Sequence, residues 1–125
     1  MNENHILKID ELKKLCQEWQ KKLHLQAWDI VVEICRKSEF ELTDVVGENH
    51  WDLRVCKSYI RILDPIDYKS SSWPYDMEVC LVHELLHLHF MLFEPKEDGL
   101  EHDHMESVIE RLANVLVELK RGKFE

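Results

Sequence analysis

The sequence has few of the residues that interrupt regular structure. Only 3 glycines and 3 prolines occur among its 125 residues, whereas 45% of the residues are hydrophobic. Disordered chains are instead rich in proline and glycine and poor in apolar residues. Because 125 residues is also a usual length for one domain, we expect a single folded domain over residues 1–125 that buries a hydrophobic core.

Basic residues are scarce relative to acidic ones. The 16 lysines and arginines are outnumbered by 25 aspartates and glutamates, which leaves a net charge of -9. This charge disfavours nucleic acids and anionic membranes, so we expect a protein or peptide partner and no nucleic acid. No basic segment followed by an apolar run begins the chain, and no stretch approaches eighteen apolar residues. We therefore expect neither a signal peptide nor a membrane span, and a cytoplasmic location; no pattern indicates an oligomeric state.

Paired cysteines are also missing, since no CxxC motif occurs. The 4 cysteines are spread along the chain, each in a segment with an apolar pattern, which favours buried free thiols over disulfides. The alternative is that Cys80, one turn before His83, serves as a thiolate ligand of a structural zinc site. The cysteines are Cys16, Cys35, Cys56 and Cys80.

Hydrophobic periodicity divides the first half of the chain into a helix and strands. Apolar residues recur every three or four positions over residues 9–23, which predicts an amphipathic helix. Alternation with β-branched residues predicts a strand over residues 28–35, and shorter runs predict strands over 51–55 and 59–63. Residues 47–49 are a turn signal ahead of the second strand. We expect a small, mostly antiparallel sheet of about three strands.

The second half of the chain predicts two helices. Asp76 can cap a helix whose apolar positions extend from Met77 to Leu88. Residues 94–99 interrupt this pattern, and a last helix is expected to begin near Asp103. The fold class is therefore α+β, with an N-terminal helix, the sheet, and two helices after it.

The sequence His83-Glu84-Leu85-Leu86-His87 is an HExxH motif within the first of these two helices. Residues four apart lie on the same helix face, so both imidazoles can bind one ion. Zinc favours imidazole nitrogen, and an open coordination position lets it lower the pKa of a bound water towards neutrality. Glu84 can then act as the catalytic general base that takes the proton of this water. The alternative is a solvated helix face that carries histidine and glutamate.

The third ligand decides the subclass of such a site. The residues after His87 lack the glycine and histidine of the HExxHxxGxxH pattern, which excludes a metzincin. Glu106 and Glu110 lie four apart in the last helix, so one can bind metal while the other accepts a proton from a ligand histidine. We choose Glu106, because a ligand on a helix is held more rigidly than Glu101 or His102, which we expect in the connecting loop. The downstream candidates are Glu101, His102, His104, Glu106 and Glu110.

Over roughly its last hundred residues the chain resembles the gluzincins, in particular the small phage and bacterial minigluzincin-like peptidases and the ImmA/IrrE metallopeptidases. The resemblance is carried by residues 28–30, 60–65, 81–88 and 106–113, of which only 81–88 is specific. It implies a zincin-like metallopeptidase fold.

The resemblance also implies a set of site residues. In that family a glutamate that opens the helix after HExxH completes the zinc site, and Glu106 matches it. A small residue about two turns later, matched by Ala113, allows the helices to pack closely. The polar residue one turn after the ligand supports the site, a role that falls to Glu110. The implied cofactor is Zn²⁺, bound by His83, His87 and Glu106.

Residues and resemblance together predict an enzyme, a zinc metallopeptidase that hydrolyses peptide bonds through a metal-activated water, with the sheet edge pairing with an extended peptide. One alternative is a three-histidine zinc hydrolase acting near nucleic acid through His102 or His104, against which the net charge of -9 argues. The other is a non-catalytic zinc-binding regulator on the same scaffold.

Other residues with hydrogen-bonding rings have structural interpretations. His89 lies about 200° around the helix from His87 and is expected to pack or to face solvent. Tyr59 and Tyr75, beside the sheet, are expected in the core.

Overall fold

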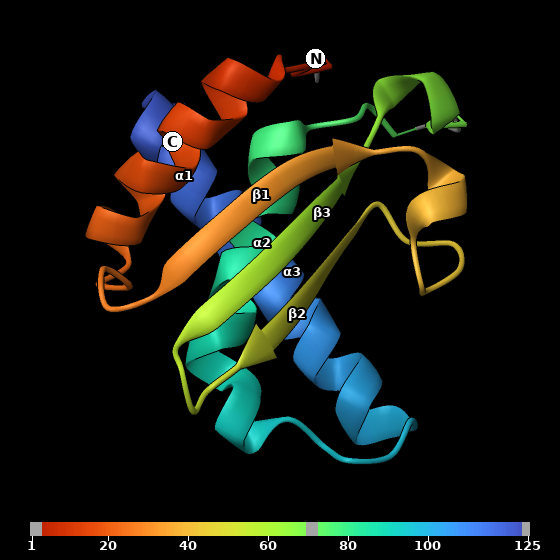
Figure 1. Ribbon diagram of the computed structural model, residues 1–125. Helices are drawn as coiled ribbons and strands as arrows, with labels where there is room; N and C mark the ends of the chain where they lie inside the picture. The colour runs from red at the N-terminus through yellow and green to blue at the C-terminus, as the bar shows by residue number, and fades with distance from the viewer. Residues whose placement is uncertain (1–3, 70–72, 124–125) are drawn as a thin grey trace.

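The computed structural model describes residues 4–69 and 73–123. These residues form a three-stranded sheet and three α-helices, which confirms the α+β class. In Figure 1 the sheet faces the viewer, α2 crosses behind it, and α3 packs against α2. In chain order the elements are α1 Ile9–Lys22, β1 Asp29–Cys35, η1 Lys37–Glu39, β2 Gly47–Asp52, β3 Lys57–Leu63, η2 Pro65–Asp67, α2 Met77–Phe90, η3 Met91–Phe93 and α3 Leu100–Arg121, where η marks a 3-10 helix.

Helix α1 forms where the apolar period predicts it. Leu12, Cys16 and Trp19 are buried on one side of the helix. At the start of the helix the carboxylate of Glu11 accepts a hydrogen bond of 3.0 Å from the backbone N–H of Lys8, an amide that has no partner within the helix. The helix ends at residue 22, one residue before the predicted end.

The sheet has the strand order β1-β3-β2 and contains two kinds of pairing. Strands β2 and β3 pair antiparallel, but β1 and β3 pair parallel, so the prediction of a mostly antiparallel sheet was wrong for one of its two pairings. The path of residues 36–46 is the physical reason. This connection carries the chain to the far edge of the sheet, and β3 then returns between β1 and β2 (Figure 1). Alternation of side chains does not encode strand direction.

Strand β2 lies earlier in the sequence than predicted. It covers Gly47–Asp52 rather than residues 51–55, and the predicted turn at 47–49 forms its first half. The chain turns at 53–56 instead, where Cys56 has a φ of 51°. No glycine, asparagine or proline marks this turn, so composition could not reveal it. Cys56 is also only half-buried, contrary to expectation, although all four cysteines are free as predicted.

Helix α2 is buried on nearly every side. Of its 14 residues, 11 are buried, which is the pattern of a helix inside a core. Asp76 caps it as predicted, since its carboxylate accepts a hydrogen bond of 3.1 Å from the backbone N–H of Val79. Although α2 is apolar, neither it nor any other helix among residues 4–69 and 73–123 is long and apolar enough to cross a bilayer.

Helix α3 begins at Leu100, three residues before the predicted start near Asp103. Glu101 and His102 therefore lie in its first turn and not in a loop, which corrects the prediction. No side-chain cap marks this start; the carbonyl of Gly99 accepts the amide hydrogen of Asp103 at 2.9 Å. The fully buried side of the helix consists of Ile109, Ala113 and Val117.

A buried carboxylate joins the three helices. Glu78 of α2 is 5% exposed and accepts a hydrogen bond of 2.8 Å from the indole Nε1 of Trp19 on α1. On α3, Arg121 donates to Glu78 at 3.0 Å, and Lys120 pairs with the same carboxylate. Charged donors thus satisfy the buried charge of Glu78. The contacts link the first turn of α2 to the last turn of α3 and hold the two helices in register.

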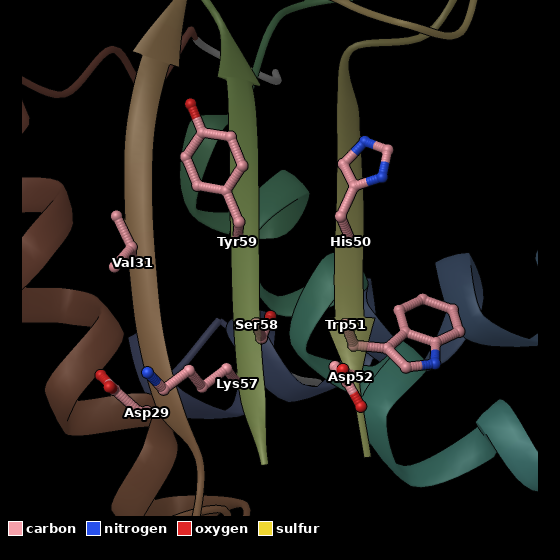
Figure 2. Close-up of a pocket in the computed structure, with 8 residues that line it drawn as sticks. All are labelled: Asp29, Val31, His50, Trp51, Asp52, Lys57, Ser58 and Tyr59. Atoms are coloured by element: carbon pink, nitrogen blue, oxygen red, sulfur yellow. The ribbon is translucent and has the colours of Figure 1, made fainter. Parts of the chain in front are cut away.

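The face of the sheet away from α2 carries an open hollow of about 530 Å³ (Figure 2). Val31, Tyr59 and His50 line it from the three strands, and none of the residues predicted to bind metal does. Tyr59, expected in the core, lies half-buried on this face with its hydroxyl against Glu33. Tyr75 is in the core as predicted and donates a hydrogen bond of 2.6 Å to the carbonyl of Leu63.

Candidate metal centre

Helix α2 carries the two histidines of the motif one turn apart. The imidazole centroids of His83 and His87 are 5.3 Å apart, and the planes are tilted by 46°. The side chain of His87 is 8% exposed and that of His83 is 17% exposed. The four-residue spacing thus delivers two nearly buried imidazoles to one side of the helix.

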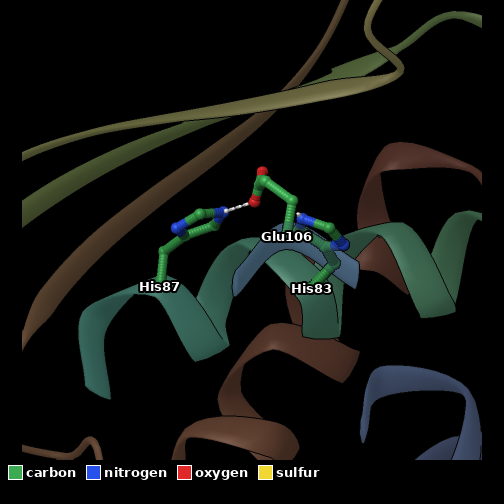
Figure 3. A group of neighbouring side chains, drawn as sticks. All are labelled: His83, His87 and Glu106. Atoms are coloured by element: carbon green, nitrogen blue, oxygen red, sulfur yellow. Dashed lines mark ion pairs between the residues drawn. The ribbon is translucent and has the colours of Figure 1, made fainter. Parts of the chain in front are cut away.

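Helix α3 brings a carboxylate to these two rings (Figure 3). The distances are 3.1 Å from Glu106 Oε2 to His87 Nε2 and 3.5 Å from Glu106 Oε1 to His83 Nε2. One ligand atom from each of the three residues lies within 4.8 Å of the others. The Oε2 atom of Glu106 is buried, and its 3.1 Å contact with His87 Nε2 does not have the geometry of a hydrogen bond. Since an unsatisfied buried oxygen is costly, this donor set fits a metal ion that would satisfy it.

A second carboxylate lies behind His83. Glu110 Oε1 is 2.8 Å from His83 Nδ1, and the amide of Asn114 donates to Glu110 Oε2 at 3.2 Å. With its Nε2 towards Glu106, His83 can donate the proton on Nδ1 to Glu110. The structure therefore contains the contact that the spacing of Glu106 and Glu110 predicted.

The histidines and carboxylates at this site shift one another's pKa values. Burial opposes protonation of His83, but the carboxylates of Glu106 and Glu110 outweigh it and raise its pKa to about 10. Contacts with His83 and His87 hold the pKa of Glu106 well below its ordinary value. A cation bound between these groups would replace protons on the imidazoles, so metal uptake is expected to release protons.

Glu84 lies between the motif histidines and beneath strand β2. It is 7% exposed, and burial raises the pKa of its carboxyl to about 7, although the nearby histidines act in the opposite direction. A carboxyl group with a pKa near neutrality can both take up and release a proton at physiological pH.

Strand β2 covers the motif with alternate residues. The amide of Asn49 donates a hydrogen bond of 2.8 Å to the backbone carbonyl of Glu84. Trp51 stacks on His87, with the ring centroids 6.1 Å apart and an interplanar angle of 20°. Gly47, at the start of the strand, packs against Glu84 and Cys80. This role of β2 was not predicted, because Gly47-Glu48-Asn49 has the composition of a turn. An alternation that begins at Gly47 is the signal that could have revealed it.

A cleft of about 500 Å³ is lined by His83 and Glu106, two of the three predicted ligands. Glu84 and Glu110 also line it, and aromatic and apolar side chains form much of the rest. The outer lining includes Val45, Val46, Tyr68, Trp73, Pro74 and Tyr75.

No protein-family model, curated protein or solved structure matches the chain. The functional inference therefore depends on the motif and on the geometry of the site.

The remaining histidine candidates lie outside this group of three within the described part of the chain. His102 Nε2 is 3.8 Å from Glu94 Oε1, and His104 lines an apolar groove with Phe93 on another side of α3. His89 is exposed, in line with the prediction that it packs or faces solvent, and its Nε2 atom lies 2.6 Å from the carbonyl of Leu23.

A second cluster of potential ligands occurs at the outer face of the sheet. Atoms of Glu41, Glu48 and His50 lie within 4.8 Å of one another. Arg61 Nη1 is 3.3 Å from Glu48 Oε1 and 3.2 Å from His50 Nε2, so the charge of Glu48 is already compensated by a guanidinium. Unlike the site at Glu106, this cluster contains no buried oxygen that lacks a hydrogen-bond partner.

Proposed function

We propose that this protein is a zinc-dependent peptidase with a zincin-like fold, in which His83, His87 and Glu106 hold the metal. The observation that carries the proposal is the convergence of two imidazole Nε2 atoms and a carboxylate from a second helix, with the buried carboxyl of Glu84 beside them. Two histidines and a glutamate, with a position left open, form a donor set of catalytic zinc rather than of structural zinc.

Zinc, when bound, supplies Lewis-acid activation of a water and of the scissile carbonyl. The carboxylate of Glu84 accepts the proton of the attacking water and passes it to the leaving amine. In the metal-free protein the pKa of Glu84 is about 7, and a nearby bound cation would lower it, so Glu84 would be present as the carboxylate that a general base requires at neutral pH. Glu110 holds the ring of His83 through the 2.8 Å contact with Nδ1.

Strand β2 supports a peptide as the substrate. It lies at the end of the strand order β1-β3-β2, so one side of it has no partner strand among residues 4–69 and 73–123. Its residues Asn49 and Trp51 contact the motif helix directly. An extended peptide that adds to this edge would lie over the motif, beside the 500 Å³ cleft, and would be held by backbone hydrogen bonds.

The four free thiols favour a reducing compartment such as the cytoplasm.

The test combines metal analysis with peptidase assays on the wild type and Glu84→Gln. We expect about one zinc per chain in both proteins, and activity on unfolded protein substrates in the wild type alone. A wild type that binds zinc but cleaves nothing would replace the peptidase with a non-catalytic regulator. A wild type that takes up no zinc would refute the metal site itself.

The third ligand is tested with a matched pair on α3. Glu106→Ala should weaken zinc binding strongly, whereas His104→Ala, on another side of the helix, should leave it unchanged. Loss of zinc in His104→Ala with full binding in Glu106→Ala would favour the three-histidine hydrolase instead.

A further inference from the structure

Glu94 lies just after η3, in the connection from α2 to α3, and its side chain turns towards the interior. Its carboxyl Oε2 atom is 3.7 Å from His87 Nδ1. Both of these atoms are buried and neither has a hydrogen-bond partner. The other oxygen, Oε1, lies 3.8 Å from Nε2 of His102.

The two residues before Glu94 face solvent, whereas Glu94 faces the interior. Leu92 is 77% exposed and Phe93 is 74% exposed, whereas the side chain of Glu94 is 23% exposed. Turning a carboxylate inward while two large apolar side chains face water is unfavourable in terms of solvation alone. The chain therefore turns Glu94 towards His87 although burial of Leu92 or Phe93 in its place would be more favourable for solvation.

The two motif histidines have related surroundings. Each presents Nε2 to Glu106, and each has a carboxylate oxygen near Nδ1, from Glu110 for His83 and from Glu94 for His87. A neutral imidazole that binds a metal through Nε2 carries its proton on Nδ1, which requires an acceptor when buried. A shift of roughly 0.7 Å would bring Glu94 Oε2 within hydrogen-bonding distance of His87 Nδ1.

We infer that Glu94 is the positioning residue of His87, which accepts the Nδ1 proton and fixes the ring with Nε2 towards the metal. This inference rests on the proposed zinc site. It assigns to the connection between α2 and α3 a direct part in building that site.

The experiment measures the affinity for Zn²⁺ alone, by competition with a chromophoric chelator, in the wild type and three variants. Glu94→Ala should weaken binding by about 10 to 100-fold, the scale for loss of a group that orients a ligand. Glu94→Gln keeps an oxygen that can accept the proton and should lose less. Glu97→Gln removes an exposed carboxylate from the same connection and should bind zinc as the wild type does.

A second measurement separates positioning from general stability. Nitrogen-15 spectra of the zinc-loaded protein should show His87 protonated at Nδ1 and protected from solvent exchange. In Glu94→Ala this protection should fall for His87 and persist for His83, whose Nδ1 faces Glu110, and in Glu94→Gln the loss at His87 should be smaller. A wild type without zinc affinity would overturn the proposed function. A wild type that binds zinc, with Glu94→Ala and Glu97→Gln binding equally tightly, would overturn the role of Glu94 alone, as would equal changes at both histidines.

Discussion

Replacement of Gly47 by alanine tests the close packing of β2 on the motif helix. A Cβ atom at position 47 would lie 2.8 Å from Cys80 Sγ, 3.0 Å from Glu84 Oε2 and 3.2 Å from Glu84 Cγ. Cys80 cannot move freely, because it is buried and its thiol donates a hydrogen bond of 3.2 Å to the carbonyl of Val46. The added methyl group must therefore displace the strand or the side chain of Glu84.

The magnitude follows from two opposing terms. Inserting a methyl group into a packed interior costs about 1–3 kcal/mol. Gly47 does not have a positive φ, so alanine can adopt its backbone conformation, and the lower entropy of the unfolded chain returns about 0.4–1 kcal/mol. We expect Gly47→Ala to lower the free energy of unfolding by about 1.3 kcal/mol net from the midpoints of the two terms, and by at most about 2.6 kcal/mol.

The assay is urea unfolding of the metal-free protein, followed by zinc affinity and peptidase activity. Zinc affinity should change little, because the contacts of Gly47 are to Cys80 and Glu84 and not to the proposed ligands His83, His87 and Glu106, whereas kcat should fall if Glu84 is the general base and is displaced. The double variant Gly47→Ala/Cys80→Ala removes the nearest atom, so a double-mutant cycle should show partial rescue. A Gly47→Ala protein as stable and as active as the wild type would refute the packing argument.

Three further predictions concern the scaffold. Asp67 accepts hydrogen bonds from Arg36 at 2.8 Å and 3.1 Å, and this pairing lowers its pKa from 3.8 to about 2. The pair therefore stabilises the fold above pH 3.8 and loses this contribution as the pH falls through 2; NMR titration should show a higher pKa in Arg36→Gln. Trp19→Phe removes the indole hydrogen bond to the Glu78 charge and should cost about 1.5–3 kcal/mol in urea unfolding, and a loss below about 0.5 kcal/mol would contradict the role of that link. Thiol titration under denaturing, non-reducing conditions should find all 4 cysteines reactive, and fewer would indicate a disulfide.

Local rules explain the parts of the fold that the sequence predicts well. The capping of α2 by Asp76 depends on a carboxylate and an amide three residues away. The placement of His83 and His87 on one side of α2 depends only on the helical period. The spacing of Glu106 and Glu110 likewise predicts that both reach the same neighbour once α3 packs on α2. Such features can be read from the sequence because each involves residues within one or two turns.

Other features of the site were wrongly predicted or missed because they depend on distant segments. Gly47 has the composition of a turn, but its contact with α2 makes it the start of a strand. The parallel pairing of β1 with β3 follows from the path of residues 36–46. Glu94 carries no motif and lies among apolar residues, so only its position beside His87 indicates a role.

The sequence by itself determined the α+β class, the three helices, the motif and its two histidines, because periodicity and spacing are properties of neighbouring residues. Only the tertiary structure decided the strand order, the cover that β2 forms over Glu84, and the position of the Glu94 carboxylate beside His87 Nδ1. Those arrangements bring together segments tens of residues apart, and packing of the helices and sheet around α2 determines which of their side chains meet.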